Sequence, residues 1–201
     1  MEDLETRARV FAERAHAAVE QVRKYTGEPC IVHPAEVAEI VRSVPHTPEM
    51  LAAAWLHDVV EDTGVTLEEV KRELGDETAA LVEMLTDVSR PEDGNRAARK
   101  AIDRAHTASA SPAAKTVKLA DLISNSSTIV AHGKGFAKVY IVEKAALLEV
   151  LRDGDAQLWQ RAHEIVIDAC NLLGLPAPQL HDDRADGAGT ANAEASAQGA
   201  S

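Results

Sequence analysis

Residues 52–63 read AAAWLHDVVEDT, and this stretch decides how the chain is expected to fold. Its apolar residues predict a buried helix face, and it carries His57, Asp58, Glu61 and Asp62 together. Because a helix returns to the same side every three to four residues, His57 is expected over Glu61 and Asp58 over Asp62. Buried carboxylates beside an imidazole are costly unless hydrogen bonds or a cation compensate them, and a divalent metal is the usual compensator. The stretch therefore predicts the floor of a metal site.

The composition of the 201-residue chain favours an all-α fold. Aromatic residues make up 3% of the sequence and alanine is abundant, which favours close-packed helices over a sandwich or barrel of β-branched strands. We expect one helical domain over residues 1–178. Residues 179–201 bury too little apolar surface to offset their ordering entropy, so we expect a disordered tail there. Apolar spacing and capping signals predict helices over residues 3–25, 34–44, 47–63, 66–74, 76–89, 112–130, 136–152 and 155–173. The charged, weakly apolar stretch over residues 96–108 is expected to be the most mobile part of the ordered domain.

The charge and the cysteines bound the function. A formal net charge of −12 argues against a protein that binds duplex nucleic acid, whereas a small anionic substrate is compatible if a metal or a local basic patch offsets the field. Cys30 and Cys170 are too few for a disulfide framework and indicate reduced thiols. There is no apolar signal core and no run of about 18 apolar residues that could cross a membrane. We expect a soluble cytoplasmic protein without a membrane partner.

Two further segments extend the candidate site. His33 stands just before Pro34, in the first turn of a predicted helix. Asp121 lies in an apolar helix with Asn125 one turn later, and a carboxylate in that setting needs a partner. Lys118 can form a salt bridge with it, and the alternative is metal coordination, with Asn125 reaching what the metal binds.

Together these residues form a mixed ligand set of two imidazole nitrogens and two carboxylates. Such a set suits Mn²⁺, Fe²⁺ or Zn²⁺ and leaves coordination positions open for water and a phosphate oxygen. A metal lowers the pKa of bound water from about 15.7 towards neutrality, so a nearby carboxylate can complete its deprotonation. The set consists of His33, His57, Asp58 and Asp121.

The sequence resembles the HD-domain metal-dependent phosphohydrolases, and within them the Rel/Spo-type (p)ppGpp hydrolases. The resemblance runs from about residue 11 to 151. It is carried by RKxTGEPxIVHP over residues 23–34, LHDVVEDT over 56–63, TLEEV over 66–70, and VKLAD over 117–121 with Asn125 four residues later. It implies an HD-type helical bundle that hydrolyses the 3′-pyrophosphate of the alarmone nucleotide, releasing pyrophosphate and GDP or GTP, with one Mn²⁺ ion as the usual metal.

The resemblance also implies roles for individual residues. The four residues of the mixed set match the family's metal ligands. The pair that positions and activates the attacking water matches Glu61 and Asp62. The positions that match substrate contacts are Arg23, Lys24, Asn125 and Tyr140. Without the resemblance, Arg23 and Lys24 can equally serve to cap a helix dipole.

Departures from the family pattern concentrate around the substrate. Cys30 replaces a common tyrosine, residues 122–124 replace a basic-Leu-aromatic/His run, and Ser126-Ser127 lacks an arginine. They leave open another nucleotide substrate, such as the 2′-phosphate of NADPH. A catalytically silent nucleotide-binding module and an internal salt-bridge network are further alternatives, but the network would leave Glu61 and Asp62 without partners. The length is too short for synthetase and regulatory domains, so we expect a stand-alone hydrolase.

Overall fold

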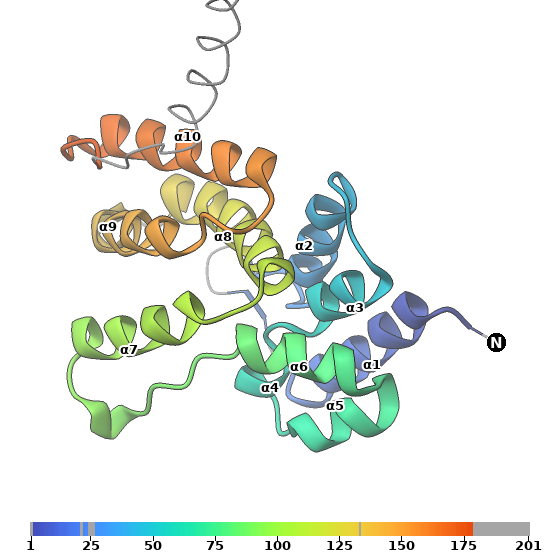
Figure 1. Cartoon of the computed structure of the whole chain (residues 1–201). Helices are drawn as coiled ribbons and strands as arrows, with labels where there is room; N and C mark the ends of the chain where they lie inside the picture. The colour runs from blue at the N-terminus through green and yellow to red at the C-terminus, as the bar shows by residue number, and fades with distance from the viewer. Residues whose placement is uncertain (1, 21, 24–26, 133, 179–201) are drawn as a thin grey trace, which may run out of the picture.

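The computed structural model describes residues 2–20, 22–23, 27–132 and 134–178, and this part of the chain is helical, with no β-strand (Figure 1). The predicted all-α class is confirmed, whereas the predicted tail at 179–201 lies outside the described residues. None of the described helices is long and apolar enough to cross a membrane. The helices are α1 (Leu4–Ala18), α2 (Val32–Arg42), α3 (Pro48–Leu56), α4 (Val59–Asp62), α5 (Leu67–Leu74), α6 (Asp76–Leu85), the short 3₁₀ helix η1 (Pro91–Asp93), α7 (Arg96–Ala108), α8 (Pro112–His132), α9 (Lys134–Val150) and α10 (Ala156–Leu173).

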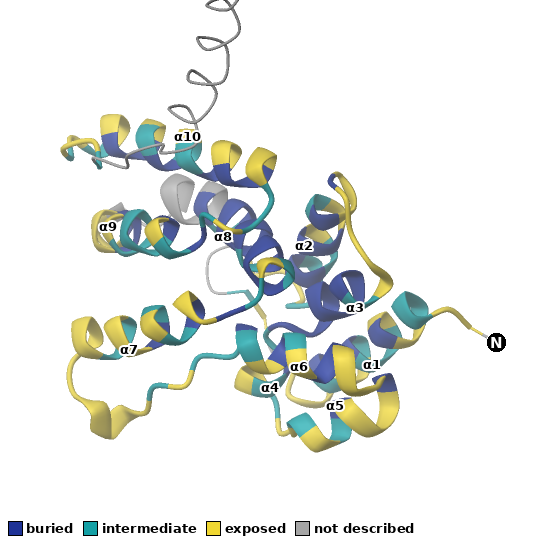
Figure 2. Cartoon of the chain, in the orientation of Figure 1, coloured by how far each residue is buried: buried dark blue, intermediate teal, exposed yellow. Residues whose placement is uncertain are grey.

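Helix α8 lies at the centre of the fold. It packs against α2, α3 and α6 on one side and against α9 and α10 on the other (Figure 1). Leu119, Leu122 and Ile123 are almost fully buried, which anchors the middle of the helix in the core (Figure 2). Side chains on this part of α8 are therefore held in fixed positions, and Asp121 lies among them.

The predicted helix over residues 47–63 is interrupted at His57 and Asp58, which separate α3 from α4. Thr47 caps α3 by accepting a hydrogen bond from the backbone N–H of Met50, as its sequence predicts. The interruption has a local cause. The His57 ring occupies the carbonyl of Ala54, which a continuing helix would offer to the N–H of Asp58. The His57 side chain and the backbone N–H of Asp58 thus compete for the Ala54 carbonyl, and the carbonyl accepts the hydrogen bond of the side chain.

Two other helices end earlier than predicted. α1 ends at Ala18 rather than near residue 25, because Val19 and Val22, which continue the apolar pattern, are exposed and gain nothing from packing. Val22 instead pairs with Pro29 in an isolated β-bridge. α6 ends at Leu85 rather than at residue 89. At the end of α1 the apolar spacing finds no packing partner, so it does not extend the helix.

Candidate metal centre

The imidazole rings of His33 and His57 meet between the start of α2 and the end of α3. Both residues are buried, and their Nε2 atoms lie 3.2 Å apart. The Ala54 carbonyl can only accept a hydrogen bond, so His57 Nδ1, at 2.8 Å, carries the ring proton of the neutral form and leaves the lone pair on Nε2. Two ring nitrogens this close need a proton or a cation between them. The pair is suited to hold a metal ion.

Two carboxylates complete the cluster. Asp58 Oδ2 lies 3.2 Å from His57 Nε2 and 3.7 Å from His33 Nε2. Asp121 Oδ1 approaches from α8, at 3.1 Å from His33 Nε2 and 3.8 Å from His57 Nε2. His33, His57 and Asp58 each offer a ligand atom within 4.8 Å of the others. The structure thus brings the four predicted ligands together, and their nitrogen and oxygen donors fit a divalent metal.

The charges in the cluster are mutually dependent. Burial alone would lower the pKa of His57, but the carboxylates of Asp58 and Asp121 raise it to about 9. Burial works in the opposite sense on Asp58, yet His57 holds its pKa at about 2. The pKa of Asp121 is well below its usual range despite burial, through the hydrogen bond from His33 and the charge of Lys118. Without a metal, a proton on His57 takes the place of a cation.

The sequence left two alternatives for Asp121, a salt bridge with Lys118 and coordination of a metal. In the structure each alternative uses a different oxygen of the carboxylate. Oδ1 faces the histidines, while Oδ2 lies 3.7 Å from Lys118 Nζ. The Asn125 side-chain amide donates to Oδ1 at 2.6 Å, one turn further along α8. Both partnerships are therefore present in one side chain.

His33 has further contacts on its far side. Its Nδ1 lies 3.0 Å from Ser124 Oγ on α8, and that hydroxyl donates to Glu36 Oε2 at 2.7 Å. Arg23 Nη1 lies 3.4 Å from the same Glu36 oxygen. The sequence singled out neither Glu36 nor Ser124 as a site residue. The only signal was the departure at residues 122–124 and the position of Glu36 one turn after His33.

Glu61 and Asp62 lie on α4, just after the interruption. Glu61 Oε1 accepts a hydrogen bond of 2.6 Å from the backbone N–H of Asp87. Glu61 is exposed as a whole residue, but its carboxyl group has lost much of its solvent, and this is the main reason why its pKa is raised to about 7. The charge of Lys118 lowers the pKa, whereas the charges of Asp87 and Asp58 raise it further. Asp62 is exposed. A carboxylate with a pKa near neutrality can accept a proton at physiological pH.

A cleft of about 690 Å³ opens beside the cluster, between α7, α8 and α9. Asp58, Asp121, Asn125 and Tyr140 line it. An adjoining cavity of about 370 Å³ is lined by Glu61 and shares three residues with the cleft. Burial lowers the pKa of Lys144, one of the basic residues in the cleft wall. Those basic residues are Arg96, Lys100, Arg104, Lys118, Lys138 and Lys144. The same wall carries five carboxylates, which are Asp58, Asp87, Asp103, Asp121 and Glu143. Arg96, Lys100 and Lys118 form ion pairs with four of them, so the cleft has charges of both signs with a small basic excess.

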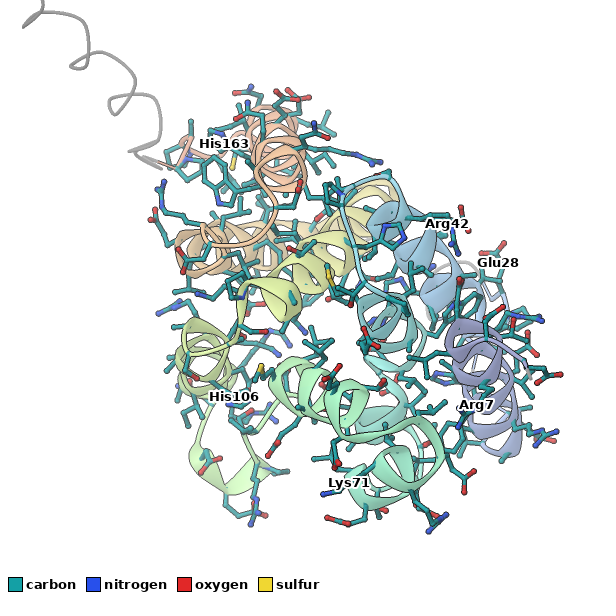
Figure 3. The ribbon with its side chains drawn as sticks, turned by 45° about the vertical axis from the view of Figure 1, so that its right-hand side comes forward. Arg7, Glu28, Arg42, Lys71, His106 and His163 are labelled. Carbon is teal, nitrogen blue, oxygen red and sulfur yellow. The ribbon has the colours of Figure 1, made fainter. Side chains whose placement is uncertain are left out.

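The remaining predicted contacts are placed differently. Arg23 is not among the residues that line the cleft and contacts Glu36, and Lys24 lies outside the described residues. Figure 3 places His106 and His163 near the edge of the molecule, where His106 contacts the Glu83 carbonyl and His163 the Trp159 ring. Neither belongs to the cluster.

Comparisons with known proteins agree with this arrangement. The HD domain family model matches residues 8–134. A probable guanosine-3′,5′-bis(diphosphate) 3′-pyrophosphohydrolase from Synechocystis sp. is 45% identical over 84 residues, which are 42% of this chain and 11% of that protein. The Homo sapiens guanosine-3′,5′-bis(diphosphate) 3′-pyrophosphohydrolase MESH1 is 40% identical over 118 residues, which are 57% of this chain and 63% of that protein. The chain thus spans less than two thirds of either relative.

A solved structure shares the fold over nearly its whole length. It is described as "A metazoan ortholog of SpoT hydrolyzes ppGpp and plays a role in starvation responses". The TM-score is 0.75 at 27% sequence identity, and the match covers 88% of this chain and 98% of the other. The helical arrangement around α8 is therefore shared with that protein.

Proposed function

The chain belongs to the HD domain family, whose model matches more than half of it, and from this we propose that it is a metal-dependent phosphohydrolase. Its proposed reaction is hydrolysis of the 3′-pyrophosphate of guanosine tetra- or pentaphosphate, which yields pyrophosphate and GDP or GTP. The observation that carries the proposal is the convergence of two imidazole nitrogens and two carboxylates beside a cleft that the two carboxylates line together with six basic residues. The names of the similar proteins support this choice of substrate.

The proposed metal ligands are His33, His57, Asp58 and Asp121, which would hold one divalent ion, in our proposal Mn²⁺. When bound, such an ion lowers the pKa of a coordinated water and attracts a phosphate oxygen. The chain itself fixes the ligand atoms. His57 donates through Nδ1 to the Ala54 carbonyl, and Asn125 donates to Asp121 Oδ1, so neither side chain is free to turn away.

Glu61 is the proposed general base, and Asp62 the residue that orients the attacking water with it. The pKa of Glu61, about 7, allows its carboxylate to take a proton at neutral pH and to release it after the reaction. The backbone N–H of Asp87 donates to Oε1 of this carboxylate and so fixes its orientation. Both acids lie on α4, after the interruption, and neither is one of the four proposed metal ligands.

The basic residues of the cleft would receive the phosphates of the substrate. Lys118 Nζ lies 3.7 Å from Asp121 Oδ2, and the charge of Asp121 also acts on Lys144. Both lysines would offset the chain's net charge of −12 locally. The proposed substrate contacts also include Asn125 and Tyr140, which line the cleft. Arg23 and Lys24 remain proposed contacts on the basis of the resemblance of residues 23–34.

The deciding experiment measures pyrophosphate release from ppGpp with Mn²⁺, beside NADPH and simple nucleotides. Wild type should release pyrophosphate from ppGpp, and Asp58→Ala should not. Phosphate release from NADPH instead would keep the site and replace the substrate. If none of these compounds is turned over in a metal-dependent reaction, the proposal is refuted.

We further propose a cytoplasmic location, which the free thiols of Cys30 and Cys170 support.

A further inference from the structure

The contact between His33 and Ser124 joins two elements that are far apart in the sequence. His33 lies in the first turn of α2, and Ser124 lies on α8, three residues after Asp121. Ser124 is 6% exposed and His33 is 6% exposed, so water does not readily replace either partner. Ser124 Oγ lies 3.0 Å from His33 Nδ1, the ring nitrogen that faces away from the carboxylates.

The direction of this hydrogen bond follows from counting protons. A serine hydroxyl has one proton to donate. Ser124 Oγ lies 2.7 Å from Glu36 Oε2, and an ionised carboxylate can only accept, so the hydroxyl proton points to Glu36. The contact with His33 must then have the ring N–H as its donor. In the metal-free structure Nε2 donates a proton to Asp121 Oδ1 at 3.1 Å. When a metal takes the place of that proton, Nδ1 keeps its own proton and Nε2 is left with the lone pair that binds the metal.

We propose that Ser124 and Glu36 are positioning residues that hold His33 in the tautomer and orientation needed to bind a metal. Removing the Ser124 hydroxyl leaves the buried Nδ1–H without its acceptor. Removing the Glu36 carboxylate frees the hydroxyl to donate to Nδ1, which favours the tautomer with its proton on Nε2. Either change places the ring in a state that binds a metal less well.

Glu36 also contacts Arg23 through the same oxygen. Arg23 Nη1 lies 3.4 Å from Glu36 Oε2, and the Arg23 side chain is 11% exposed, whereas that of Glu36 is 51% exposed. The carboxylate therefore links the orientation of the ligand His33 to the position of Arg23. This link to Arg23 rests on the proposed function, whereas the metal part of the inference does not.

The test compares metal affinity in Ser124→Ala, Glu36→Ala and the double variant, by calorimetry with Mn²⁺ on metal-stripped protein. Each single variant should bind about 10- to 100-fold more weakly, the loss seen when partners of metal-binding histidines are removed. The double variant should lose little more than the weaker single variant, because both changes break one chain of hydrogen bonds. The matched control is Glu39→Ala, an exposed glutamate on α2 that contacts Arg42 at 3.3 Å. Ser124→Ala with an affinity within twofold of wild type would overturn the inference.

A measurement on the wild type keeps the inference testable if a variant folds poorly. In Zn²⁺-loaded protein with ¹⁵N-labelled histidine, NMR should show His33 bound through Nε2 with a slowly exchanging proton on Nδ1. A proton on Nε2 would contradict the inference directly. Neither experiment needs a nucleotide, so a wrong substrate assignment would leave both results unaffected.

Glu36→Gln tests the link to Arg23 separately. The amide oxygen can still accept from Ser124, so metal affinity should stay within about threefold of wild type, while the KM for ppGpp rises and kcat at saturating metal changes little. An unchanged KM, in a protein that does hydrolyse ppGpp, would show that Glu36 does not place Arg23 for the substrate.

Discussion

Raising the pH from 7 to 9 should strengthen the binding of a divalent metal to the metal-free protein about 50-fold. The cause is His57, whose pKa is about 9 in the metal-free protein because Asp58 and Asp121 outweigh the effect of burial. A metal can bind Nε2 only after the extra proton has left. At pH 7 about one molecule in 100 has lost it, and at pH 9 about one in two.

The same proton contributes to folding stability with a defined sign. The pKa of His57 is raised from 6.5 to about 9, so its contribution is fully present below pH 6.5 and is lost as the pH rises through 9. The shift corresponds to about 3 kcal/mol. The pKa of Asp58 is lowered from 3.8 to about 2, so its contribution is present above pH 3.8 and is lost as the pH falls through 2. His57 and Asp58 should therefore contribute most to the folding stability of the metal-free protein between about pH 4 and pH 6.5.

Three measurements check this. An NMR titration of the His57 ring in metal-free protein should give a midpoint near 9, and calorimetry in buffers of different ionisation enthalpy should show about one proton released per metal bound at pH 7.5. Urea unfolding of metal-free protein should show stability falling between pH 6.5 and 9. His46→Gln, which changes an exposed histidine outside the cluster, should leave all three results unchanged. A metal affinity that is constant from pH 7 to 9 would refute the reasoning.

Further variants test the base, the buried cation and the core around α8. Glu61→Gln should lower kcat by about 10²- to 10⁴-fold with metal affinity nearly unchanged, and a normal kcat would exclude it as the base. Lys118→Met removes the partner of a buried carboxylate and should cost about 3–5 kcal/mol in urea unfolding. Lys71→Met breaks an ion pair more than half exposed on both sides and should cost at most about 1 kcal/mol, so equal losses would contradict this. Gly154→Ala places a methyl group 2.8 Å from an α8 side chain and 3.1 Å from its backbone and should cost about 1–3 kcal/mol, whereas Gly64→Ala meets nothing within 4 Å and should be tolerated.

The helical class and the residues of the candidate metal centre followed from short-range patterns. Thr47 before Pro48 marks a helix start, and the pairing of His57 with Asp58 marks a charged point on an apolar helix. These patterns depend only on neighbouring residues in the sequence, so they can be recognised without knowledge of the tertiary contacts. The interruption at His57 could not be predicted in this way, because it depends on which acceptor the side chain finds. That acceptor, the Ala54 carbonyl, is equally available to the helix backbone.

The contacts of Ser124 could not be predicted for a different reason. Ser124 lies 88 residues from Glu36 and 91 from His33, and no local pattern links them. In the sequence, Ser124 stands out only because residues 122–124 depart from the basic-Leu-aromatic/His run of the family. Likewise the basic residues of the cleft come from α7, α8 and α9, and their concentration in one place becomes visible only once the helices are packed.

The central position of α8 makes this helix a wall shared by the metal centre and the cleft. Its Asp121 belongs to the cluster, and Asp121, Lys118 and Asn125 line the cleft. The helix packs against α2 and α3 on one side and against α9 and α10 on the other (Figure 1). A shift of this one helix would therefore change the ligand geometry and the shape of the cleft together, so the two parts of the site are mechanically coupled.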